Sequence, residues 1–148
     1  MTTRERMLEL KSYEQMCRAA LAATAYFETA CLTDPMNIPA GEAFRVRDIR
    51  DCRQNLEKTY LVMIFARFEA SLRDYWRIGC GKHTHPQVNV LLDRIAVRSY
   101  MQADALLHAH AVREYRNSIV HGGHALSVAI AEARNYLCTY LSHLPRQW

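Results

Sequence analysis

Glycine and proline are confined to a few short segments of this 148-residue chain, and this placement constrains its fold more than any other feature. The five glycines and four prolines fall at 35–41, 79–86, 122–123 and 145. Between them lie four uninterrupted blocks, at 1–34, 42–78, 87–121 and 124–144. Blocks of this length are too long for ordinary β-strands and are typical of helices. No alternating segment is flanked by turn dipeptides, so the sequence predicts no β-hairpin.

Apolar residues recur three or four positions apart within these blocks, which is the helical period. In the last block this stripe is expected to run from Leu126 to Leu144. The third block has a weaker period, and a break near Ser99–Asp104 would give one short helix followed by one of about five turns. Such stripes require burial against other helices. The sequence therefore predicts an all-α fold, a single domain over 1–148 built as a four-helix bundle with room for one extra short helix.

Composition excludes several classes of protein. Apolar residues make up 50% of the chain and charged residues 23%, which excludes a disordered class. The five cysteines are widely spaced without a C-x-x-C pair, which argues against a disulfide scaffold or a zinc ribbon. The first seven residues carry charges where a signal peptide needs an apolar stretch, and no apolar run is long enough to span a membrane. We expect a soluble, cytoplasmic protein without a membrane partner.

The positive charge is concentrated in the middle of the chain. The net charge is +4, and 16 of the 19 basic residues are arginine. Arginine binds phosphate through two parallel hydrogen bonds, so this surplus suits a nucleic-acid partner. A genome that prefers arginine codons explains it equally well.

One segment near the end of the third block combines residues that can take part in catalysis. In a helix, Asn117 and His121 lie four apart and share a face, and the long side chain of Arg116 can reach the same region. Gly122 and Gly123 are expected to end the helix, which leaves His121 in its last turn. Composition gives about 0.03 chance matches to an arginine–asparagine pair with a histidine at this spacing.

This motif, Arg116-Asn117-x-x-x-His121, resembles the signature of the HEPN superfamily, in which an arginine precedes a histidine by four to six residues. The segment Phe65–Trp76 is also similar to the long second helix of HEPN proteins. The resemblance implies a HEPN-like helical bundle that forms a homodimer and brings two Arg/His sets into a shared cleft. It further implies a metal-independent endoribonuclease that uses no cofactor, often within toxin–antitoxin or antiphage systems. RNA and an antitoxin or other regulatory protein are then the expected partners.

The chain departs from one HEPN pattern two residues after the histidine. In HEPN toxins partnered by a nucleotidyltransferase antitoxin, a tyrosine typically stands at this position and is modified. This chain has Gly123 there. The departure argues against that kind of antitoxin and leaves the cleavage chemistry untouched.

If the chain cleaves RNA without a metal ion, each residue of the motif has an expected role. His121 would act as the base or acid, because imidazole gains and loses a proton near neutral pH. Arg116 would stabilise the charge that develops on the phosphate, and Asn117 would orient His121 or donate to the phosphate. Three alternatives remain: a non-catalytic HEPN-like module that binds RNA or protein, a helical interaction protein, and a purely structural helix end with Arg116 paired to a carboxylate.

Three residues of the second block are weaker candidates for substrate binding. Glu69 and Arg73 lie four apart and could border the cleft, although an ordinary surface ion pair is the simpler interpretation. Arg67 could contact an RNA backbone. The histidines near Cys80 and elsewhere lack a fourth ligand at a familiar spacing, so no metal site is predicted.

Overall fold

The computed structural model describes all residues 1–148, which form helices joined by irregular segments. The α-helices are α1 (Thr3–Thr33), α2 (Val46–Asp74), α3 (Val88–Arg98), α4 (Ala103–His121) and α5 (Ile130–Ser142). A 3₁₀ turn occupies Pro35–Asn37 and a π-helical turn extends α2 over Tyr75–Gly79. The predicted all-α class is confirmed, and so is the break that separates a short helix from one of about five turns. None of these helices is long and apolar enough to cross a membrane.

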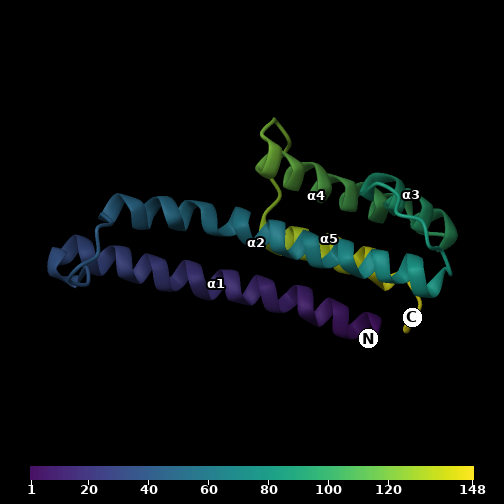
Figure 1. Ribbon diagram of the computed structural model, residues 1–148, viewed down its shortest axis with the longest axis horizontal. Helices are drawn as coiled ribbons and strands as arrows, with labels where there is room; N and C mark the ends of the chain where they lie inside the picture. The colour runs from purple at the N-terminus through teal and green to yellow at the C-terminus, as the bar shows by residue number, and fades with distance from the viewer.

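Helices α1 and α2 form a long antiparallel hairpin (Figure 1). Helix α5 packs against both of them, α4 packs on α2 and α5, and α3 packs on α2 and α4. The connected end of the hairpin extends well beyond α4 and α5, whereas both termini lie together at the other end (Figure 1). There the Thr3 N–H donates to the Arg146 carbonyl at 3.0 Å. The C-terminal end of α4 consequently lies over the middle of α2, beside the uncovered part of the hairpin.

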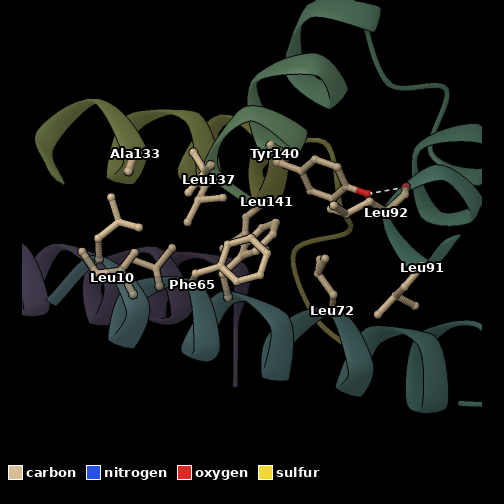
Figure 2. Packing of buried hydrophobic residues seen from close by; sticks show 14 of the residues in the cluster. Leu10, Phe65, Leu72, Leu91, Leu92, Ala133, Leu137, Tyr140 and Leu141 are labelled. Atoms are coloured by element: carbon tan, nitrogen blue, oxygen red, sulfur yellow. Dashed lines mark hydrogen bonds between the residues drawn. The ribbon is translucent and has the colours of Figure 1, made fainter. Parts of the chain in front are cut away.

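The core is built from the apolar stripes that the periodicity predicts. The side chains from α2 and α5 interdigitate in Figure 2 and are joined there by leucines of α1 and α3. Phe68 is completely buried and meets the Tyr140 ring edge-on, with 5.4 Å between the ring centroids. The fully buried members of the α2 and α5 stripes are Leu61, Ile64, Phe65, Phe68, Leu72, Ala133, Leu137, Tyr140 and Leu141.

Two buried carboxylates fix α1 to its neighbours. Glu14 is 3% exposed, and its Oε2 lies 2.7 Å from Arg134 Nε of α5. Glu28 is also buried, and its Oε1 lies 2.8 Å from Arg50 Nε of α2. A buried charge without a partner is strongly unfavourable, so these pairs define which helices α1 can pack against.

The last helix begins later than the sequence predicts. Residues 124–129 are an irregular connection, and Leu126 is 91% exposed, so the prediction of a buried helical stripe starting at Leu126 is wrong. The physical reason is a long-range cap: Glu57 Oε1 of α2 accepts a hydrogen bond from the Ile130 N–H at 2.8 Å. A carboxylate at the first free N–H groups stabilises a helix start there.

The cysteines are all free, as expected from their spacing. Cys17 and Cys31 are buried on the inner face of α1. Burial raises the pKa of the Cys17 and Cys138 thiols, which favours the uncharged form. Both thiols are therefore less reactive than an exposed cysteine, because the thiolate is the reactive form.

Replacing Tyr140 by phenylalanine should destabilise the protein by about 0.5–1.5 kcal/mol, the net value of one hydrogen bond. The Tyr140 hydroxyl donates to the Leu92 carbonyl at 2.7 Å in the core (Figure 2), so the substitution removes a buried hydrogen bond between α5 and α3. The burial of this tyrosine also raises its pKa. Urea unfolding followed by circular dichroism measures the loss. Tyr26→Phe, at a position 80% exposed, is the matched control and should change nothing; an equal loss in both would contradict the argument.

Candidate functional site

The side chains predicted to be catalytic lie on the last two turns of α4. Ala105, Ala109 and Val112 form the buried stripe of this helix, and Arg116 continues it one turn further. The guanidinium carbon of Arg116 lies 6.0 Å from the centroid of the Phe65 ring on α2. Arg116 is half-buried, because the stripe reaches solvent at this turn. The cation thus lies against the apolar Phe65 ring, where water screens its charge less than at an open surface.

Arg116 is hydrogen-bonded to its neighbour and not to a carboxylate. Its Nη1 donates to Asn117 Oδ1 at 3.0 Å, and its Nε is buried without a partner. The ion pairs of the chain do not include Arg116. The carboxylate expected of a purely structural helix end is therefore missing. The guanidinium keeps donors for an anionic ligand.

His121 is the last residue of α4 and is exposed. Gly122 and Gly123 follow with φ of 76° and 131°, backbone conformations that favour glycine and end the helix. The ring hydrogen bonds of histidine in this chain involve His110 and His143, so the His121 imidazole is free of intramolecular partners. It can accept or donate a proton to a bound molecule without breaking an existing bond.

Within one chain, the three motif residues are only partly brought together. A hydrogen bond joins Arg116 to Asn117, and none joins either of them to His121. Arg116 and His121 are five residues apart, which places them about 140° apart around the helix axis. Arg116 is directed toward Phe65 and His121 toward solvent. A ligand that touches both must reach around the end of α4, or meet residues of a second molecule there.

A cleft of about 700 Å³ lies on another side of α4, in the corner between α4, the middle of α2 and the loop after Gly122. Lys58 of α2, Tyr115 of α4 and His124 of the loop line it. Arg116, Asn117 and His121 do not. Sequence reasoning missed this cleft, because nothing in the pattern around Lys58 indicates that α4 crosses α2 at this point.

The three weaker candidates are engaged elsewhere in the bundle. Arg73 donates to Glu69 Oε1 through Nε at 2.9 Å and Nη2 at 2.6 Å, which is the ion pair of the simpler interpretation. Arg73 also donates to the Pro86 carbonyl at 3.3 Å. Arg67 forms an ion pair with Glu9 of α1, with 2.6 Å between Nε and Oε1, and this contact with the carboxylate raises the pKa of the arginine. None of the three contacts Arg116 through a hydrogen bond or an ion pair.

Two histidines outside the motif form contacts with other side chains of the bundle. His108 stacks on Tyr136 with 4.1 Å between ring centroids, and His110 Nε2 lies 2.8 Å from Asp93 Oδ1. No group of three or more His, Cys, Asp or Glu side chains is arranged to hold a metal ion.

Comparison with known proteins found no matching family model, no matching curated protein and no matching solved structure.

Proposed function

We propose that this chain is a HEPN-like, metal-independent endoribonuclease that acts as a homodimer. The observation that carries the proposal is the free guanidinium of Arg116. It is half-buried, hydrogen-bonded to Asn117 and unpaired with any carboxylate, five residues before an exposed histidine at a helix end. Arginine in this state is suited to a phosphate diester, which accepts two parallel hydrogen bonds.

The reaction uses the ribose itself as the nucleophile. The imidazole of His121 takes the proton of the 2′-OH, and O2′ attacks the adjacent phosphorus. The bond from phosphorus to O5′ then breaks, and a protonated imidazole supplies the proton that O5′ needs. Arg116 stabilises the negative charge on the non-bridging oxygens, while Asn117 positions the guanidinium. The products are a 2′,3′-cyclic phosphate and a 5′-hydroxyl.

The homodimer is supported by the surface around His121. Val120, next to His121 in the sequence, is 46% exposed, and Leu126 of the following loop is 91% exposed, so the segment that carries the histidine also exposes apolar side chains. Arg116 and His121 also lie about 140° apart around the helix, which favours a site that is completed by a second chain. Two chains related by a twofold axis at this end of α4 would place one chain's histidine opposite the other's arginine, and the two imidazoles would supply the base and the acid.

A non-catalytic HEPN-like module that binds RNA or protein is the second candidate. It is favoured by the cleft between α2 and α4, which contains Lys58 and His124 but none of the three motif residues. In that case the cleft would hold the ligand, and an antitoxin or other regulatory protein would be an equally suitable occupant.

Purified protein should cleave single-stranded RNA in excess EDTA and leave a cyclic phosphate end. An RNA with a single 2′-deoxy nucleotide should resist cleavage at that nucleotide, because the nucleophile is missing there. If the site is shared between two chains, the rate per chain should fall on dilution below the dimer dissociation constant. Gel electrophoresis with end analysis measures all three results. Binding without cleavage would support the non-catalytic module, and cleavage abolished by EDTA would contradict the mechanism.

A further inference from the structure

A second groove lies at the opposite end of α4 from His121. It has a volume of about 560 Å³ and is formed by the end of α2, the loop 80–87 and α3. Trp76 and Val97 supply its apolar part, and Lys82, Arg94 and Arg98 supply its cations. These five residues come from three segments that only the fold brings together.

The cations of this groove are not neutralised. Lys82, Arg94 and Arg98 are exposed, and no carboxylate lies within 4.0 Å of any of them. The one acid that lines the groove, Asp93, has its Oδ1 2.8 Å from His110 Nε2, and it leaves three cations against one carboxylate. Arg94 and Arg98 are also one turn apart on α3, an arrangement of like charges that weakens a helix. The groove is thus a site of unbalanced positive charge that an anion would stabilise.

Tyr100 follows the groove residue Arg98 by two positions, at the C-terminal end of α3, and has a backbone conformation that favours glycine. The Met101 N–H donates to the Ala96 carbonyl at 3.0 Å and the Tyr100 N–H to the Val97 carbonyl at 3.4 Å, the two bonds of a Schellman motif. Its left-handed position is normally glycine, yet here a tyrosine occupies it with φ of 49° and an exposed fraction of 94%. The backbone of a tyrosine in this conformation is strained, and its side chain is almost fully exposed.

The groove is held in shape before any ligand arrives. Trp76 Nε1 donates to Thr84 Oγ1 at 3.1 Å, and the Lys82 N–H donates to the Trp76 carbonyl at 3.0 Å. Arg73 donates to the Pro86 carbonyl across the same loop. A site that is already ordered loses less entropy when it binds.

We propose that this groove binds single-stranded RNA, with its phosphates on Lys82, Arg94 and Arg98 and a base stacked on Tyr100. Cations along a groove combined with an exposed aromatic ring form the usual arrangement for binding single strands without sequence preference. The proposal rests on the proposed ribonuclease function and adds an anchoring site for the substrate. Helix α4 has 19 residues and separates the two sites by about 28 Å along its axis, so only longer RNAs can occupy both.

Fluorescence anisotropy of labelled oligouridine tests the proposal directly. The titrations are made in EDTA with His121→Ala protein, so that the RNA stays intact. Tyr100→Ala should weaken binding by about tenfold and Tyr100→Phe should not, because stacking needs the ring and not the hydroxyl. The double variant Arg94→Ala/Arg98→Ala should lower the slope of log K against log[salt] by about 1.4, the value for two lost phosphate contacts on a single strand.

Matched controls separate this effect from folding and from general electrostatics. Tyr26→Ala and Lys11→Ala replace exposed residues of α1 and should leave RNA binding unchanged. Tyr100→Gly should raise the unfolding midpoint by about 2–4 °C while it weakens binding, a combination that a structural role does not produce. Binding of heparin, a polyanion without bases, should respond to the arginine variants and not to Tyr100→Ala.

The outcomes distinguish this proposal from the proposed function. Unchanged RNA affinity in Tyr100→Ala and in the double arginine variant would overturn the anchoring site, even if the protein cleaves RNA. Weaker binding in these variants, together with cleavage that is absent from the wild-type protein, would support the groove and overturn the ribonuclease. No binding of wild-type protein to RNA would overturn the groove.

Discussion

Replacing His121 by alanine is expected to reduce the rate of RNA cleavage by about 10²–10⁴-fold, the usual contribution of a general base or acid. The imidazole is exposed at the end of α4 and has no hydrogen-bond partner within the chain, so it is available to transfer a proton to or from bound RNA. The substitution removes no buried contact, and the unfolding midpoint should stay unchanged. Initial rates on a labelled RNA in EDTA measure the loss.

His143→Ala is the matched control for this prediction. His143 follows α5, and its ring bonds the Thr139 carbonyl at 2.9 Å, so it belongs to no proposed site. Cleavage should persist in this variant. Undiminished cleavage in His121→Ala would show that another residue performs the proton transfer, and the assignment of the motif would then be wrong.

Replacing Phe68 by alanine is expected to destabilise the protein by about 3–5 kcal/mol. Phe68 is completely buried, with its ring centroid 5.4 Å from that of Tyr140 and 5.9 Å from that of Phe65. The substitution leaves a cavity between α2 and α5 that their helical backbones cannot close. Because domains of this size are stable by only about 5–15 kcal/mol, the loss is a large fraction of the total free energy of unfolding.

Urea unfolding followed by circular dichroism measures the effect of Phe68→Ala. Leu107→Ala is the control on α4, because Leu107 is 65% exposed and its truncation leaves no cavity. It should change the free energy of unfolding by less than about 0.5 kcal/mol. A loss below about 1 kcal/mol in Phe68→Ala would mean that α2 and α5 do not pack through this residue.

The helices themselves could be predicted because their signals are local. Glycine and proline mark the ends of the blocks, and the apolar period within each block identifies the buried face of α1, α2 and α5. The break between α3 and α4 was predicted at Ser99–Asp104 and lies at residues 99–102. The start of α5 was not predictable in this way, because its cap is Glu57, a residue 73 positions away from Ile130.

The candidate site likewise has one part that could be predicted from the sequence and another part that could not. Arg116, Asn117 and His121 lie within six consecutive residues, so their spacing on one helix could be inferred from the sequence. That Arg116 lies over Phe65 and that Arg67 binds Glu9 depend on how the helices cross. The left-handed conformation of Tyr100 is equally invisible in the sequence, since the pattern there would suggest an ordinary loop.

The sequence by itself thus determined the all-helical class, the bounds of most helices and the one motif with catalytic potential. The tertiary structure alone decided that the guanidinium of Arg116 has no acidic partner, and that Lys82 joins Arg94 and Arg98 in one groove. The physical reason is that periodicity records which face of a helix avoids water. Which residues that face contacts is decided by packing and charge pairing between segments far apart in the chain.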